Sequence, residues 1–174
     1  DGHRLYVERE VPLEVRAYDG ANFPTEVGSV ESLQVKVLVA GEIKRPESIK
    51  IEITSENNLF FHYVHEMNKE GFAEMAEAQR LVIDFAEYGS LLVRLIASCL
   101  KEPQAFLGVM VFTRDKAARL DFIQNMEHKF VELLSLKFVA SPDEVVRRCL
   151  TYRYNNAKSK LAILQAKMAD VNAL

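Results

Sequence analysis

The chain has 174 residues, 49% of them hydrophobic, which is enough for one domain with a buried core or for a domain with a helical extension. Its formal net charge of −3 argues against a general nucleic-acid binder, because binding to phosphates usually needs a basic excess. Cys99 and Cys149 lack metal-ligand spacing, and there is no apolar signal run, so we expect an intracellular protein without a disulfide framework. No run approaches eighteen apolar residues, so no membrane span is predicted.

Apolar residues alternate along the first third of the chain, which predicts antiparallel strands. Pro12 interrupts the first strand, and this predicts an edge position or a bulge there. The segment from 17 to 29 is rich in turn residues and is expected to be a loop. Three strands in a meander are predicted, at residues 5–17, 33–39 and 49–53. The chain begins with Asp1 instead of methionine, so we expect it to be a fragment.

The stretch FFHYVHE, residues 60–66, places two histidines three residues apart with a glutamate after them, which raises the question of a metal site. The aromatic composition of residues 57–68 predicts a strand and not a helix. In a strand His62 and His65 point to opposite faces, so they do not converge on one ion. We interpret them as solvent-facing strand histidines and expect neither a metal nor another cofactor.

Two helices are expected next. The first covers residues 69–80, with Phe72, Met75 and Ala76 facing inward. A strand is expected at Leu81–Phe85. The second helix covers residues 87–101 and should bury Leu91, Leu92, Leu95, Ile96 and Cys99. Three strand segments then follow, at residues 105–112, 118–124 and 129–140, with the polar tip NMEH before the last one.

The C-terminal segment has the signals of a long helix. Ser141 is expected at the N-cap and Pro142 at the first helical position, with the acids Asp143 and Glu144 in the first turn. Thirty helical residues span about 45 Å, more than the head is expected to cover, so a coiled coil is favoured over a helix packed along its own head. The predicted dimerisation seam alternates four- and three-residue steps: Leu150, Tyr154, Ala157, Leu161, Leu164, Met168 and Val171.

The fold class that these elements predict is α+β. A small antiparallel β-sandwich or barrel with an inserted helix pair forms a head at residues 4–140. The long C-terminal helix at residues 141–174 begins a coiled-coil stalk.

Several separated motifs carry a resemblance. The stretch from Ile53 to Cys99, with its FF strand, short helix, DF motif and helix ending near a cysteine, resembles the PISA motif of the centriolar spindle-assembly-abnormal protein six family. The stretches VPLEVRAYD and LSLKF fit as well. The resemblance implies a head, a parallel coiled-coil stalk and no enzymatic activity. It also implies homo-oligomerisation into the cartwheel hub of the centriole or basal body, within the cytoskeleton of the cytoplasm. A shorter paralogue of the flagellar base or apical complex is similar to the chain to the same degree.

In that family a phenylalanine at a hairpin tip inserts into an apolar pocket of the neighbouring head. The resemblance therefore implies a head-to-head contact at Asn125, Met126, Glu127, His128 and Phe130. This chain departs from the pattern, because Glu127 or His128, depending on the alignment, stands at the phenylalanine position. Divergence and an engineered charge both explain Glu127, and a bulge between Phe130 and Leu134 would move Phe130 towards the tip. With Glu127 or His128 there, we expect the contact to be weak.

The sequence also bears on two other classes of function. The same architecture occurs in DNA end-joining scaffolds, and the long helix holds six cationic and three acidic side chains, so a DNA-binding or microtubule-binding scaffold is the alternative. An enzyme is not expected, because the chain has no GxGxxG, P-loop or GxSxG motif and Cys99 lies on the apolar face of a helix. Other centriolar or flagellar-base proteins are further candidate partners.

Overall fold

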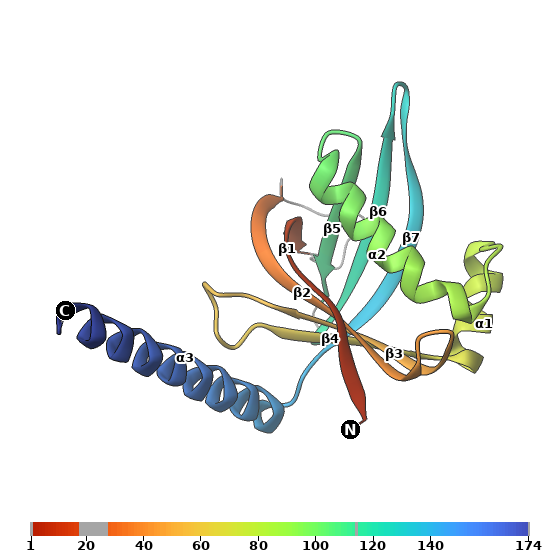
Figure 1. Cartoon of the computed structure of the whole chain (residues 1–174). Helices are drawn as coiled ribbons and strands as arrows, with labels where there is room; N and C mark the ends of the chain where they lie inside the picture. The colour runs from red at the N-terminus through yellow and green to blue at the C-terminus, as the bar shows by residue number, and fades with distance from the viewer. Residues whose placement is uncertain (1, 18–27, 114, 174) are drawn as a thin grey trace. The chain divides into compact units, whose positions relative to one another are not determined.

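The computed structural model describes residues 2–17, 28–113 and 115–173. The chain divides into two units, a head of Asp1–Ala140 and a C-terminal segment of Ser141–Leu174. Most of the loop expected at residues 17–29 lies outside the described residues. The elements of the head and the C-terminal helix are shown in Figure 1: β1 (His3–Ala17), β2 (Ser29–Glu42), β3 (Arg45–Thr54), β4 (His62–Asn68), α1 (Lys69–Gln79), α2 (Phe85–Lys101), β5 (Phe106–Phe112), β6 (Ala117–Met126), β7 (Lys129–Ala140) and α3 (Asp143–Asn172).

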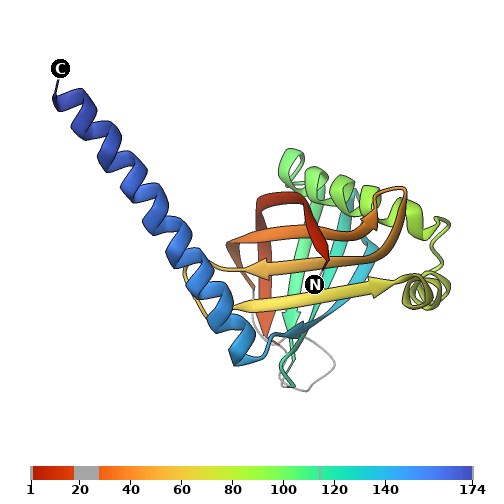
Figure 2. The same cartoon turned by 60° about the horizontal axis from the view of Figure 1, so that its bottom comes forward.

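The strands of the head form a closed barrel in the order β1-β2-β3-β4-β7-β6-β5, which confirms the predicted fold class. Neighbouring strands are antiparallel except β1 and β5, which pair in parallel over Glu14–Ala17. Pro12 pairs across from Ser32 on β2, and it lies just before the stretch of β1 that bonds to β5. A proline has no N–H to donate, so this edge-like position suits it. Figure 2 shows β2, β3 and β4 side by side.

The barrel interior is filled by the alternate apolar residues of the strands. The register places Val37 of β2 opposite Ile51 of β3, and both side chains are buried. On β1 the fully buried residues, Val11 and Leu13, lie in the second half, whereas Val7 in the first half is only partly buried against the core and Leu5 is exposed. The helices complete the core with Phe72, Phe85, Tyr88, Leu92, Leu95, Ile96 and Cys99.

The strand expected at Leu81–Phe85 is not present. The N–H of Leu81 bonds instead to the carbonyl of Ala76 and closes the C-terminus of α1. Asp84 is the N-cap of α2, and its N–H donates to the Glu87 carboxylate, so the chain turns directly into the helix. Leu81 and Ile83 still face the core and Val82 is fully exposed, so the alternation is real but no strand lies alongside to pair with it.

β4 begins later than the sequence predicts. The Ser55 hydroxyl accepts from the backbone N–H groups of Asn57 and Asn58, and the Asn58 side chain accepts from the N–H of Phe60. These side-chain bonds fold the segment into turns and compete with strand pairing. Strand pairing therefore starts at His62.

The expectation of solvent-facing histidines was wrong, because His62 and His65 are both buried, at 5% and 3% exposure. Their placement on opposite faces follows from the register, in which His65 lies across from Ile51 and His62 across from Thr54. The side chain of His65 shares the barrel interior with Ile51. Burial alone therefore does not bring the two rings together.

Inside the barrel His65 joins three elements. Its Nδ1 lies 2.8 Å from the carbonyl oxygen of Lys137 on β7, and its Nε2 lies 2.9 Å from the Tyr88 hydroxyl on α2. A carbonyl only accepts, so Nδ1 carries the proton and Nε2 accepts from Tyr88. Burial lowers the pKa of His65 and raises that of Tyr88, which keeps both groups neutral.

A second side chain bonds to β7 in the same way. β4 and β7 pair at only two positions, Tyr63 with Ala140 and Val64 with Val139. Further along β7 the amide of Gln79, at the end of α1, donates to the carbonyl of Ser135 and accepts from its N–H, at 2.7 and 2.9 Å. Gln79 of α1 thus supplies hydrogen bonds to a part of β7 that does not pair with the backbone of β4.

The long helix α3 starts at Asp143, one residue later than expected. Pro142, and not Ser141, is at the N-cap position, with an extended ψ of 152°, and its carbonyl accepts from the N–H groups of Val145 and Val146. Asp143 and Glu144 lie in the first turn, where the helix dipole favours negative charge.

Replacing His65 with glutamine should flatten the pH dependence of stability. The folded-state pKa of His65 lies below its unfolded value of about 6.5, so its contribution is present above that pH and is lost as the pH falls. Glutamine keeps one donor and one acceptor but does not titrate. Urea unfolding at pH 7.5 and 5.5 should show a loss for the wild type that exceeds the loss for His65→Gln by about 1 kcal/mol.

The matched control is His128→Gln, because the side chain of His128 is 93% exposed. It should leave the pH dependence of the unfolding free energy unchanged. Equal losses in the wild type and His65→Gln would contradict the neutral, buried state of His65.

Candidate self-association sites

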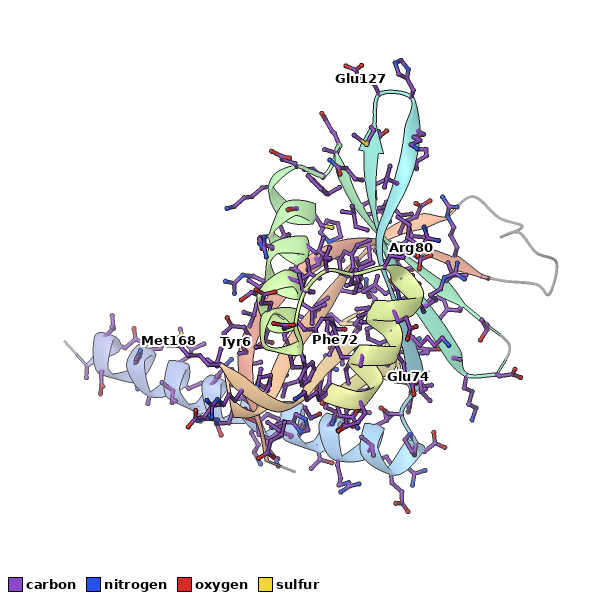
Figure 3. All side chains as sticks on the ribbon, turned by 90° about the vertical axis from the view of Figure 1, so that its right-hand side faces the viewer. Tyr6, Phe72, Glu74, Arg80, Glu127 and Met168 are labelled. Atoms are coloured by element: carbon purple, nitrogen blue, oxygen red, sulfur yellow. The ribbon has the colours of Figure 1, made fainter. Side chains whose placement is uncertain are left out.

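The hairpin of β6 and β7 carries the predicted head contact residues. Met126 pairs with Lys129 and Asn125 with Phe130, which leaves Glu127 and His128 as the two residues of the turn. Figure 3 shows Glu127 at the far end of this hairpin, pointing away from the barrel. Both alignments that the sequence leaves open therefore put a polar residue at the tip.

Apolar side chains lie just behind the tip. Phe130 is 66% exposed and Met126 49%, whereas the turn residues Glu127 and His128 are almost fully exposed. The carboxylate of Glu127 lies 3.9 Å from the ring nitrogen Nε2 of His128. A pair this exposed contributes little. The hairpin thus has a charged tip with exposed apolar side chains directly behind it.

A bulge lies in this hairpin, between the pairs Phe122–Leu134 and Ile123–Glu132, and leaves Leu133 without a partner on β6. It falls between Phe130 and Leu134, where the sequence allowed for one. It does not move Phe130 to the tip, because the bulge is nearer the barrel than Phe130 and the pairing from Glu132 to Lys129 is regular again. Phe130 stays three residues from Glu127.

A groove runs between β1 and α2. Its apolar lining comes from Val7 on β1 and from one side of α2, and its cationic side chains are Arg9 and Lys101. The α2 residues that line it are Val93, Ile96, Ala97, Leu100 and Lys101. Leu100 is 38% exposed and Val93 is half-buried, so apolar surface remains open there.

Sequence reasoning missed this groove. The residues of α2 predicted to face inward were Leu91, Leu92, Leu95, Ile96 and Cys99. Val93, Ala97 and Leu100 form a second apolar stripe at helical spacing beside them. The available signal was that the apolar face of α2 is wider than packing against the barrel requires. Its partner, the exposed side of β1, becomes apparent only when β1 and α2 are brought together.

The predicted seam of α3 is open to solvent. The side chains of Leu161, Leu164, Met168 and Val171 are between 56% and 69% exposed, and Tyr154 and Ala157 are exposed as well. Only Leu150, in the third turn, is half-buried. A single helix with this much exposed apolar surface in one row needs a partner to cover it.

A shallow hollow on α3 has the arrangement that such a partner requires. It is lined by Leu164, Lys167, Met168, Val171 and Asn172. If Met168 is at an a position of the heptad, then Leu164, Lys167, Met168 and Val171 are the d, g, a and d residues that surround a knob from a parallel partner helix. The hollow supports the predicted seam as a packing surface.

The described part of the chain offers little for catalysis or metal binding. No group of three or more His, Cys, Asp or Glu side chains among these residues is arranged to hold a metal ion. Cys99 is 2% exposed, and burial raises the pKa of its thiol to about 11, which disfavours the reactive thiolate. None of the helices described here is both long and apolar enough to cross a membrane.

Comparison with known proteins assigns the family. Residues 5–138 match the family model described as the centriolar protein SAS N-terminal domain. The chain belongs to this family. The match covers the whole barrel and both inserted helices, so the predicted resemblance is confirmed. The family is one of centriolar structural proteins. A search among curated proteins by sequence found no match.

Solved structures of family members have the same fold. An N-terminal fragment of Leishmania SAS-6 with parts of its coiled coil and a phenylalanine-to-glutamate substitution is 18% identical, with a TM-score of 0.80 over 98% of this chain and 93% of that one. A Drosophila melanogaster Sas-6 fragment is 15% identical, with a TM-score of 0.79 over 99% and 82%. A C. elegans SAS-6 coiled-coil dimer is 12% identical, with a TM-score of 0.74 over 93% and 94%.

Replacing both Leu161 and Leu164 with serine should convert any stalk dimer to monomer and leave the head folded, because both side chains are exposed in the single chain. Three heptads alone are marginal, so the wild-type dimer should be measured at high concentration by sedimentation equilibrium. Circular dichroism checks that the barrel is intact.

The control is Ile163→Ser. Ile163 is as exposed as its neighbours at 56% but lies outside the predicted seam. This variant should dimerise like the wild type. A dimer that survives the double replacement would instead favour a helix packed along its own head.

Proposed function

We propose that this chain is a self-assembling structural scaffold of the centriole or basal body, where it builds the cartwheel hub, or of the flagellar base. It acts by pairing head with head and stalk with stalk. Two separate two-fold contacts in one chain generate a ring or a helix by repetition. The family match supports this reading over a DNA end-joining scaffold.

The observation that carries the proposal is that the head has both a protruding β6–β7 hairpin, drawn in Figure 1, and an apolar groove that the C-terminal half of α2 helps to line. The N–H of Asn125, at the base of the turn, donates to the carbonyl of Ala105 at 2.7 Å, in the connection between α2 and β5. The groove includes Leu100 and Lys101 at the end of α2, a few residues away. A two-fold contact needs both surfaces on one side, so that each head inserts its hairpin into the groove of the other.

The chemistry of the two surfaces is complementary. Met126 and Phe130 are apolar, as is the lining of the groove, and Glu127 is negative where Arg9 and Lys101 are positive. An ion pair at such a rim contributes at most about 1 kcal/mol, whereas inserting a carboxylate into the apolar lining would cost several kcal/mol. Glu127 should therefore stay at the rim, and the contact should be weak.

The stalk contact is supported by the exposed seam of α3 and by the relatives. The Drosophila fragment is described as dimerised through its coiled coil, and the C. elegans fragment as a coiled-coil dimer. We propose that α3 pairs in the same manner. Each weak contact raises the effective concentration for the other, so a pair of them stabilises an oligomer that neither would hold alone.

Glu127→Phe should strengthen head association. An aromatic side chain that buries 150 Å² or more contributes roughly 4 kcal/mol before association costs, well above the rim ion pair that it replaces. We expect a gain of at least about 1 kcal/mol, seen as a higher association state in sedimentation velocity. Curved or ring-like oligomers should appear by electron microscopy when the stalk is intact.

Phe130→Ser should weaken the same contact, and Phe60→Ser is its control, because Phe60 is 76% exposed on the connection between β3 and β4. His128→Phe, measured in parallel, decides which turn residue faces the groove. If neither aromatic replacement raises the association state, the family's head contact is not present in this chain, and the hub proposal loses its mechanical basis.

A further inference from the structure

The cations of α3 follow the edges of its seam. With Tyr154, Leu161 and Met168 at a positions, the successive g positions hold Arg153, Lys160 and Lys167. Lys158 holds an e position, and the other e positions are neutral: Thr151, Gln165 and Asn172. Along the seam from Leu150 to Val171 every g residue is therefore cationic, and no e residue is acidic.

The acidic residues of this helix are confined to its ends. Asp143 and Glu144 lie in the first turn, and Asp170 lies near the last one. From residue 145 to 169 the sequence contains no aspartate or glutamate, although it contains all six cationic side chains of the helix. The net charge of this stretch is therefore +6.

Dimerisation brings these cations together. In a parallel coiled coil a g residue faces the e residue five positions further along the partner helix. Arg153 of one copy then faces Lys158 of the second copy, which is a repulsive pair. Lys160 and Lys167 face Gln165 and Asn172, which cannot neutralise them. Each side of the dimer thus carries a row of cations contributed by both chains.

We propose that this row is a binding site for an acidic polypeptide segment, and that binding strengthens the stalk dimer. The inference rests on the proposed pairing of α3. The row is complete only when the g residues of one copy lie beside the e residues of the other. A polyanion therefore binds the dimer more tightly than the single helix and stabilises it by mass action.

The partner is a polypeptide and not a nucleic acid, for two reasons. The helix carries a net charge of +3 and the whole chain −3, so the rest of the chain carries −6, and this charge repels a long duplex that extends beyond the helix more than a short acidic segment that lies only along it. The g cations also stand seven residues apart, about 10.5 Å along the helix. A helical segment with a glutamate every seven residues has the same spacing.

The experiment measures the dimer dissociation constant of the chain by sedimentation equilibrium. The Leu161→Ser, Leu164→Ser variant is measured in parallel to account for association through the heads. A 20-residue glutamate-rich helical peptide is the probe, and a glutamine-rich peptide and a short DNA duplex are the comparisons. The glutamate peptide should lower the dissociation constant at least about threefold, as expected for relief of two repulsive pairs. Without peptide, raising the salt concentration should also strengthen the dimer.

A position swap tests the placement of the charges at constant composition. The variant combines Ser159→Lys with Lys160→Ser, and Ala166→Lys with Lys167→Ala. It moves two cations from g positions to the outward f positions. Without peptide it should dimerise about as tightly as the wild type, because the pair of Arg153 and Lys158 is unchanged, and it should respond less to the glutamate peptide. The inference is overturned if the glutamate peptide changes the dissociation constant of the swapped variant as much as that of the wild type. It is also overturned if the peptide has no effect on the wild type, or if duplex DNA has a larger effect than the peptide.

These outcomes are separable from a failure of the proposed function. If the wild type and the Leu161→Ser, Leu164→Ser variant associate equally at high concentration, the stalk dimer is absent and the proposed function fails together with this inference. If the wild type forms a stalk dimer that ignores the glutamate peptide, only this inference fails.

Discussion

The head depends on how the barrel closes between β4 and β7. Only two residue pairs join these strands, and beyond them hydrogen bonds from His65 and Gln79 reach the backbone of β7. Buried backbone groups must be satisfied, so the side chains of His65 on β4 and Gln79 on α1 take part in closing the barrel. With its edge held by side chains, β7 continues past β4 and forms the hairpin that carries Phe130 and the tip.

The same arrangement explains why the PISA-like segment is a fold element. His65 is neutral, buried and bonded on both ring nitrogens, which leaves neither nitrogen available for a metal or a substrate. Tyr88 and Phe138 pack against its ring, so the histidine links α2 and β7 through the core. In the sequence the two histidines resemble a pair of metal ligands, but in the structure His65 connects helix α2 to the barrel.

Charge is distributed unevenly between the two units. The head carries the negative charge, while the exposed length of α3 is cationic beside an apolar seam. A strong seam flanked by opposite charges would fix the dimer permanently. The like charges beside the proposed seam would make the strength of an α3 dimer depend on salt and on anionic partners. Weak contacts of this kind suit an assembly that forms only where its components are concentrated.

Much of the fold could be predicted because the local patterns agree with it. Alternation identified β1, β2 and β3, helical spacing identified α1 and α2, and the heptad pattern marked the seam of α3. The failures have local causes too. Leu81 to Phe85 alternates like a strand but has no neighbour to pair with, and the turn bonds of Ser55 and Asn58 shorten β4. His62 and His65 were placed in solvent because polarity, taken alone, predicts exposure.

The sequence by itself determined the fold class, the family motif and the polar character of the hairpin tip, since each follows from residue type and spacing along one chain. Only the tertiary structure decided which residues face one another across the barrel. The burial of His65, its bond to Tyr88 and the groove between β1 and α2 arise from segments tens of residues apart, and the bulge at Leu133 arises from the register of the β6–β7 hairpin. Such contacts depend on strand register and helix docking, which the packing of the whole core fixes and no local pattern encodes.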